Sequence, residues 1–340
     1  ILSPEELART VHAFTPALVA SINYVDGIAE LCQSLDVPFL CWQIDPATHR
    51  PRRLQRTCPQ GHIFTYRQAN QVEFRDAGFE NVSHIPLATN PARRFPLQLS
   101  EHERRHYQAP LSFVGASMAN QATTYRHRFI ALAKTHGVND PIPKLERLLE
   151  RQREDYSTFQ IPNLLEDCFP GLLQKVKEEE RDLNIVSLVG EISAAEKRFA
   201  YISGLSELGI HVWGDPHWDA LRRSPVTYRG QARHFEELTR IYCASQINID
   251  IGRIYQSDII TMRVFDVLGC GGFLLTEEND ALTEHFAVGE ELETYRTLDE
   301  LRRKALYYLN HPDKARSIAQ RGHERVLRDH TIAQRVSVML

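Results

Sequence analysis

The chain has 340 residues, of which 42% are hydrophobic and 25% are charged, and its formal net charge is −4. This composition is that of a globular protein, and the length predicts two domains of ordinary size. A slightly acidic chain offers no broad basic surface to a nucleic acid, which disfavours a nucleic-acid-binding protein. No apolar run approaches the ~20 residues that cross a bilayer, which disfavours a transmembrane protein.

The first hundred residues alternate between short apolar runs and helical segments. A helix is predicted over 3–14, because Ser3 and Glu6 form a capping box and Pro4 suits a first helical turn. Four strands are expected over 17–22, 38–44, 62–66 and 82–88, with helices over 26–35 and 67–78 between them. Buried strands separated by helices predict a parallel sheet covered by helices. This half is one β-α unit short of a full domain of this kind, as expected if its first unit is missing.

A polar, proline-bearing segment over 89–110 predicts the linker, and the expected domains are 1–108 and 109–340. A strand begins at Leu111, and helical signals then dominate from about 126 to 208. Residues 184–192 are rich in β-branched residues, but apolar positions recur every three or four residues from Ile185 to Leu205, which predicts a helix. The second domain is therefore expected to carry a helical insertion.

The α/β alternation then resumes. Strands are expected over 210–214, 247–252 and 272–277, and helices over 234–245, 262–269, 297–312 and 313–327. Two α/β domains joined by one linker leave a cleft, and ligands of such sheets bind outside the carboxyl ends of the strands.

The most informative stretch surrounds the helix over 262–269. Asp258 and Asp266 have seven residues between them, and Arg263 is one of the seven. A helix N-terminus and an arginine favour a diphosphate, while carboxylates suit sugar hydroxyls, so the pattern fits a nucleotide-sugar. The alternative, which spacing alone slightly favours, makes Asp258 an N-cap and Arg263 with Asp266 a surface pair. A Gly-Cys-Gly-Gly run then lets the helix end abruptly before a buried strand.

From about Leu111 to the C-terminus the sequence resembles the CgeB-type glycosyltransferases, a branch of the GT-B superfamily first named for a spore maturation protein. The matching segments include "LSFVGAS", "GIHVWGDPHW", "MRVFDVLGCGGFLLTE" and "RGHERVLRDHT", in family order, and "SINY" and "CWQIDP" resemble the preceding domain. The resemblance implies the α/β GT-B fold: two Rossmann-like domains with parallel sheets facing a cleft, plus the helical insertion. It also implies a nucleotide-sugar donor on the second domain and an acceptor on the first.

The resemblance extends to site residues. Retaining GT-B enzymes carry two glutamates at the spacing of Asp258 and Asp266, where the first contacts the transferred sugar and the second the ribose. Asp258 thereby becomes a catalytic candidate and Asp266 a ribose ligand, although both are shorter here. The diphosphate would bind Arg263 and a second basic residue, which is either Arg198 or Arg126.

Other candidates follow the predicted strands. Gly115 and Ser117 would approach the diphosphate or the acceptor, with a plain turn as the alternative. Gly214 and Tyr228 lie where such folds hold the base, as does Trp218, which packing would equally explain.

On the acceptor side, the candidates are Asn23, Asp45 and His49. Asp45 would act as a base toward an acceptor hydroxyl, and a turn or cap role before Pro46 is the alternative.

Six cysteines are scattered along the chain, mostly in or beside apolar runs, which is typical of free thiols in a reducing compartment. Cys58 and His62 lack a second pair at zinc spacing, and no Asp-x-Asp motif follows a strand. We therefore expect a cytoplasmic glycosyltransferase that needs no metal or cofactor and is retaining by superfamily analogy. Its partners would be the donor and a glycan, protein or small-molecule acceptor. The alternatives are a GT-B nucleotide-sugar epimerase and a non-catalytic sugar- or nucleotide-binding protein of surface or spore-coat assembly.

Overall fold

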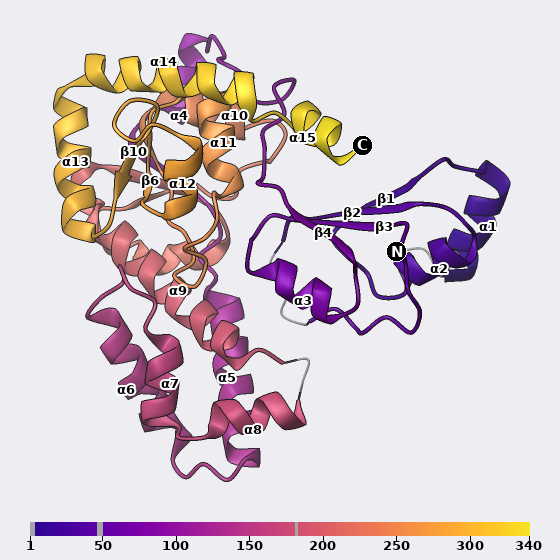
Figure 1. The fold of residues 1–340 in the computed structure, drawn as a ribbon. Coiled ribbons are helices and arrows are strands. Elements are labelled where there is room, and N and C mark those ends of the chain that lie inside the picture. Colours follow the sequence, from indigo (N-terminus) through magenta and orange to yellow (C-terminus); the bar gives the residue numbers. More distant parts are fainter. Residues whose placement is uncertain (1–3, 46–49, 181–182) are drawn as a thin grey trace. The chain divides into compact units, whose positions relative to one another are not determined.

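The computed structural model describes residues 4–45, 50–180 and 183–340, which form two compact units (Figure 1). Unit 1 comprises Ile1–Leu87, Glu180–Leu183 and Arg335–Leu340, and unit 2 comprises Ala88–Glu179 and Asn184–Gln334. The boundary predicted after residue 108 lies inside unit 2, because the segment that follows Leu87 packs on helices of that unit.

Unit 1 is built on a four-stranded parallel sheet with its strands in chain order. The strands are β1 (Val19–Ile22), β2 (Phe39–Gln43), β3 (Gly61–Thr65) and β4 (Asn81–His84), and the helices are α1 (Pro4–Phe14), α2 (Ile28–Ser34) and α3 (Asn70–Asp76). Aromatic rings fill the core, where Tyr24 meets Phe74 and Phe79 edge to face at centroid distances of 5.5 and 5.4 Å. The predicted parallel α/β arrangement of this half is confirmed.

Unit 2 holds a six-stranded parallel sheet in the order β10-β9-β8-β5-β6-β7. Its strands are β5 (Ala109–Val114), β6 (Ile210–Trp213), β7 (Thr227–Tyr228), β8 (Ser245–Ile249), β9 (Leu274–Glu277) and β10 (Glu293–Tyr295). Counted from β5, this is the doubly wound order 3-2-1-4-5-6, in which the direction of winding reverses between β5 and β8. The crevice for a ligand therefore opens at the carboxyl ends of these two strands.

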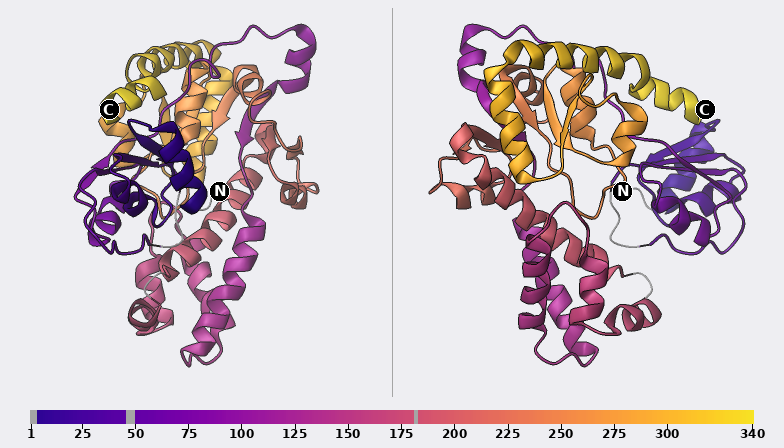
Figure 2. Two further views of the ribbon diagram at one scale, coloured as in Figure 1. Left: turned by 90° about the vertical axis from the view of Figure 1, so that its right-hand side faces the viewer. Right: turned by 60° about the vertical axis from the view of Figure 1, so that its left-hand side comes forward.

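The helical insertion lies within the crossover from β5 to β6. It consists of α5 (Ala119–Thr135), α6 (Pro141–Arg153), α7 (Ile161–Cys168), α8 (Leu172–Glu179) and α9 (Ile185–Gly204). Figure 2 shows α5 to α8 as a lobe that extends away from the sheet, with α9 running from the lobe to the sheet. The ambiguous segment over 184–192 is helical, as predicted, and the Asn184 side chain caps it by accepting from the Ser187 N–H.

The remaining elements of unit 2 cover the sheet. They are α4 (Glu101–Tyr107), α10 (Leu238–Ala244), α11 (Met262–Gly269), α12 (Asp280–His285), α13 (Leu298–Asn310), α14 (Pro312–Asp329), and the 3-10 turns η1 (Ser206–Leu208) and η2 (Pro216–Leu221). The last helix, α15 (Ile332–Met339), begins in unit 2, and its residues from Arg335 onward belong to unit 1. Within the described part of the chain, no helix combines the length and apolar character that a bilayer crossing requires.

Candidate functional site at the carboxyl ends of β5 and β8

Asp250, the residue directly after β8, organises this edge of the sheet. Its side chain is buried and accepts hydrogen bonds from the hydroxyls of Thr261 (3.1 Å) and Thr276 (2.9 Å). It also forms an ion pair with Arg263. Because Thr276 belongs to β9 and Thr261 precedes α11, this one carboxylate joins two strands and a helix start.

Arg263 lies in the first turn of α11 and reaches across to β5. Its Nε donates to the carbonyl oxygen of Val114 at 2.8 Å, and its guanidinium carbon lies 5.0 Å from the centroid of the Phe113 ring. The proposed surface pair of Arg263 with Asp266 is wrong, since the acidic partner of Arg263 is the buried Asp250. The arginine thus connects the ends of the two central strands.

Arg198 approaches the same place from α9. Its guanidinium donates to the carbonyl oxygens of Ala116 (2.7 Å) and Ile251 (3.3 Å), which follow β5 and β8. Burial, and then the positive charges of Arg263 and Arg253, lower the pKa of Arg198 to about 9. A buried cation with neighbouring cations and carbonyl partners lies in a positive potential that an anion would relieve.

Arg126, the other candidate for this role, lies elsewhere in unit 2. It pairs with Glu146 of α6 and, at 3.2 Å, with Glu196 of α9, within the ion pairs of the helical lobe. Of the two candidates, Arg198 is therefore the one that lies beside Arg263.

Gly115 and Gly214 allow two backbone segments to approach closely beside these arginines. A Cβ on Gly115 would lie 2.8 Å from a terminal nitrogen of Arg263, and a Cβ on Gly214 would lie 2.1 Å from the carbonyl oxygen of Gly115. The Trp218 indole donates to that oxygen at 2.8 Å. Its ring is buried against Phe113, so Trp218 packs inside the unit.

Ser117 and Tyr228 also bond within this corner. The Ser117 N–H and hydroxyl donate to Asp215 at 2.5 and 2.7 Å, and the Tyr228 hydroxyl donates to the Gly214 carbonyl at 3.1 Å. Ser117 is fully buried and Tyr228 is half-buried. Both candidates thus lie next to the predicted donor site, where these hydrogen bonds hold the turns after β5 and β6.

Asp266 is buried in α11 and faces the segment that leads into unit 2. Its two carboxylate oxygens accept from the Thr89 hydroxyl (2.8 Å) and from Nε of Arg94 (3.0 Å). Arg94, itself buried, also donates to the carbonyl oxygen of His234. The carboxylate therefore ties α11 to the chain after Leu87, and its ribose role stays a prediction.

Asp258 lies in a half-buried turn between β8 and α11. The N-cap alternative is wrong for α11, because Thr261 is the N-cap residue of that helix. Its neighbours Ser257 and Ile259 line the pocket described next. The sugar contact implied by the resemblance stays a prediction.

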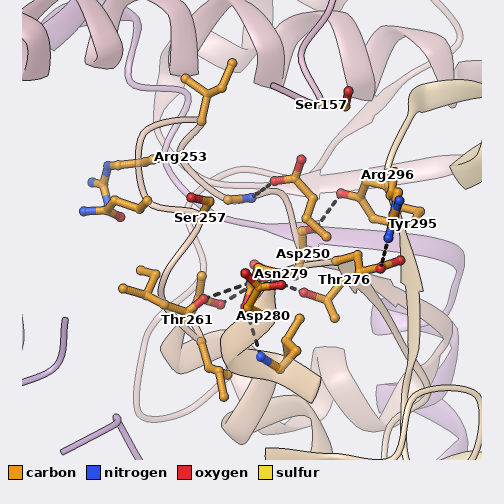
Figure 3. A pocket seen from close by; sticks show the side chains of 18 of the residues that line it. Ser157, Asp250, Arg253, Ser257, Thr261, Thr276, Asn279, Asp280, Tyr295 and Arg296 are labelled. Carbon is orange, nitrogen blue, oxygen red and sulfur yellow. Dashed lines mark hydrogen bonds and ion pairs between the residues drawn. The ribbon is translucent and has the colours of Figure 1, made fainter. Parts of the chain in front are cut away.

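A pocket of about 360 Å³ opens at the carboxyl ends of β8, β9 and β10 (Figure 3). Figure 3 shows Asp250, Thr261 and Thr276 joined by hydrogen bonds on one side of it. Lys197 of α9 and Glu277 of β9 form an ion pair in its wall. The sequence reasoning missed these two residues. The signals available were a charged residue beside Arg198 and an acid at the end of a predicted strand.

The acceptor-side candidates of unit 1 are described in part. Asn23, with φ of 63°, accepts from the Ile44 and Asp45 N–H groups at 2.9 and 3.1 Å and donates from its amide to the Asp45 carboxylate at 2.7 Å. The structure thus brings Asn23 and Asp45 together after β1 and β2. His49 lies outside the described residues.

Over the described residues, no group of three or more His, Cys, Asp or Glu side chains is suited to hold a metal ion. The six cysteines are free in this structure.

Comparisons with known proteins place the fold. The chain is similar to HepE from Anabaena in complex with UDP and glucose, with a TM-score of 0.56, 9% identity, and coverage of 98% of this chain and 80% of that chain. It is also similar to sucrose-phosphate synthase from Thermosynechococcus elongatus, with a TM-score of 0.55, 11% identity, and coverage of 98% of this chain and 75% of that chain. A third similar structure is a glycosyltransferase from Rickettsia africae, with a TM-score of 0.53, 9% identity, and coverage of 99% of this chain and 79% of that chain. The fold is GT-B.

Residues 195–340 of this GT-B chain match the family model described as "Glycosyl transferase-like". The matched part contains Lys197, Arg198, Arg263 and the whole of α11. No curated protein matches the sequence.

Proposed function

We propose that the protein is a glycosyltransferase that moves a sugar from a nucleoside diphosphate sugar to an acceptor hydroxyl or side chain. The observation that carries this proposal is the pair Arg198 and Arg263, which converge at the switch point of the second sheet. The glycosyltransferase-like match over residues 195–340 and the GT-B fold support it.

The electrostatics of the pair favour a diphosphate. Arg263 shares its charge with Asp250, whereas the described hydrogen bonds of Arg198 go to uncharged carbonyls. The N-terminus of α11 adds the positive end of a helix dipole. A diphosphate bound here would supply the negative charge that lowers the energy of the buried Arg198. The structures of HepE hold UDP and UDP-glucose, and this supports a nucleotide-sugar as donor.

We propose a retaining enzyme of the CgeB type, located in the cytoplasm. In transfer, the bond from the anomeric carbon to the diphosphate breaks, and the acceptor oxygen bonds to that carbon on the same face, which retains its configuration. The hydroxyl proton leaves with a base. Asp45 is the proposed base, and its hydrogen bond from Asn23 orients the carboxylate. His49 is proposed beside them on the acceptor side. On the donor side, Asp258 is proposed to contact the transferred sugar.

The experiment that tests the proposal begins with a thermal-shift screen against UDP, GDP, dTDP and CMP compounds. The matching nucleotide-sugars are then assayed for transfer, hydrolysis and epimer formation. Transfer or hydrolysis supports the proposal. Epimer formation alone would point to an epimerase, and binding without turnover would point to a non-catalytic binding protein.

We further propose that the reaction needs no metal ion, because two arginines and a helix terminus supply positive charge at the diphosphate. Activity is then expected to survive EDTA. Loss of activity on chelation that manganese or magnesium restores would contradict this part of the proposal.

A further inference from the structure

Lys197 and Arg198 are consecutive residues of α9, but they meet different surroundings. Arg198 reaches the switch point, whereas Lys197 lines the pocket at the ends of β8 to β10, with 2% of its surface exposed. The Lys197 ammonium forms an ion pair with Glu277 and lies 5.6 Å from the Tyr201 ring centroid. An ammonium group carries three N–H donors, so it retains capacity for a ligand in the pocket.

The Lys197–Glu277 pair is held by three parts of unit 2. Glu277 ends β9, and its second carboxylate oxygen accepts from the Gly252 N–H at 2.7 Å, in the loop between β8 and α11. A buried ion pair contributes little net stability compared with well-packed apolar residues. Because this one stands in the wall of a cavity, its position points to a ligand rather than to the core.

The positive charges that line this pocket are balanced. The three basic residues of the lining each stand beside a carboxylate: Lys197 beside Glu277, Arg296 beside Glu278 at 2.5 Å, and Arg253 beside Glu191 at 3.2 Å. Asp250 and Asp280 add acidic groups to the lining. The pocket therefore offers donors and acceptors for hydroxyls without the excess positive charge that a carboxylate ligand would need.

The pocket adjoins the proposed diphosphate site. Asp250 both lines it and pairs with Arg263, and Thr261 and Val264 bring the start of α11 into its wall. A volume of about 360 Å³ is near the lower end of ligand pockets, which fits one sugar ring rather than an oligosaccharide.

We propose that this pocket receives the transferred sugar, that Lys197 and Glu277 bind its hydroxyls, and that the sugar is neutral rather than a uronate. The inference rests on the proposed function, because it assumes a nucleotide-sugar donor. Glu277 accepts hydrogen bonds from sugar hydroxyls and Lys197 donates to their oxygens. A sugar carboxylate in the same place would face Glu277, Glu278 and Asp250 with no uncompensated cation.

The test compares three ligands by calorimetry: UDP, UDP-glucose and UDP-glucuronate, or GDP, GDP-mannose and GDP-mannuronate if the screen selects guanosine. The wild-type protein is expected to bind the neutral nucleotide-sugar, UDP-glucose or GDP-mannose (the neutral ester), more tightly than the corresponding uronate. Glu277→Gln is expected to weaken the neutral ester by about tenfold, the size of one hydrogen bond to a charged group, while nucleoside diphosphate affinity stays unchanged.

Two further variants keep the result interpretable. Lys197→Met/Glu277→Leu replaces the pair by apolar groups of similar size, so the fold is retained while the sugar contacts are lost. Glu293→Gln is the matched control, because Glu293 forms a comparable pair with Lys304 at 3.0 Å and neither residue lines the pocket. It is expected to bind all three ligands as the wild-type protein does.

Uronate binding as tight as neutral binding would overturn the neutral-sugar assignment. Equal affinities for the neutral ester in the wild-type protein and the Lys197→Met/Glu277→Leu variant would overturn the assignment of the pair. In both cases the nucleoside diphosphate still binds. Absence of nucleoside diphosphate binding to the wild-type protein would instead overturn the proposed function, and the sugar assignment with it.

Discussion

Arg198 and Arg263 share the ring of Phe113, with their guanidinium carbons 5.9 and 5.0 Å from its centroid. The two arginines come from α9 and α11, and Phe113 lies in β5, which precedes both helices in the chain. Arg263 is one of the charges that lower the pKa of Arg198. A bound anion would attract both guanidinium groups and offset the repulsion between them. Substitutions at these two arginines therefore test donor binding directly.

Removing Arg263 is expected to weaken diphosphate binding. Arg263→Ala should cost about 1.5–3 kcal/mol of nucleoside diphosphate affinity, the range for hydrogen bonds to charged groups. Calorimetry on a variant whose circular dichroism matches the wild type measures this. Arg302→Ala is the control, because Arg302 pairs on the surface with Glu207 at 3.4 Å and should leave the affinity unchanged. An unchanged affinity in Arg263→Ala would remove Arg263 from the donor site.

Removing Asp266 is expected to destabilise unit 2. Breaking a buried ion pair by deleting one partner costs about 3–5 kcal/mol, so Asp266→Ala should lower the free energy of unfolding by that amount. Urea denaturation measures the loss. Glu101→Ala, which removes one partner of an exposed pair with Arg105, should change little. If Asp266→Asn instead folds with wild-type stability and loses nucleoside diphosphate affinity, the ribose role predicted from the resemblance is supported.

Acidification is expected to destabilise the protein through His211 of β6. Burial, and then the charge of Arg229, lower the pKa of His211 below its ordinary value of 6.5, and its Nδ1 has no hydrogen-bond partner among the described residues. The unfolded chain then binds the proton more readily, so this contribution to stability is present above pH 6.5 and is lost as the pH falls toward the lowered pKa. Unfolding free energies measured from pH 7.5 to 5 should decline less in His211→Gln. Identical profiles would contradict the assignment.

A methyl group on Gly214 is expected to disrupt the corner beneath the arginines. The added Cβ would lie 2.1 Å from the Gly115 carbonyl oxygen and 2.7 Å from Nε1 of Trp218, so backbone has to shift. Overpacking of this kind costs about 1–3 kcal/mol or more. The midpoint temperature of thermal unfolding should be lower in Gly214→Ala than in the wild-type protein. An unchanged midpoint would mean that the turns after β5 and β6 can move apart without cost.

The sequence predicted the elements that periodicity marks clearly. Helix α9 follows from apolar positions three and four apart, and it formed despite its β-branched residues. Strands β7 and β10 were not predicted, because two or three residues carry no pattern. Helix α4 was assigned to the linker, although Ser100 and Glu103 form a capping box at its start.

The site depended on contacts that local spacing does not encode. Arg263 and Asp266 are three residues apart, yet each pairs with a more distant partner, Asp250 for the first and Arg94 for the second. The choice of Arg198 over Arg126 as the second basic residue at the diphosphate could not be made until the orientation of α9 against the sheet was known. Glu277 meets Lys197 only after β9 is placed beside β8.

Helix α9 belongs both to the lobe and to the sheet. It contacts α5, α6, α7 and α8, and its later residues Tyr201 and Ile202, with Leu205 just beyond, join the core under β5 and β6. Lys197 and Arg198 lie between these two regions. Because the first turns of this helix pack in the lobe and its last turns pack under the sheet, a displacement of the lobe would be transmitted directly to these two basic side chains.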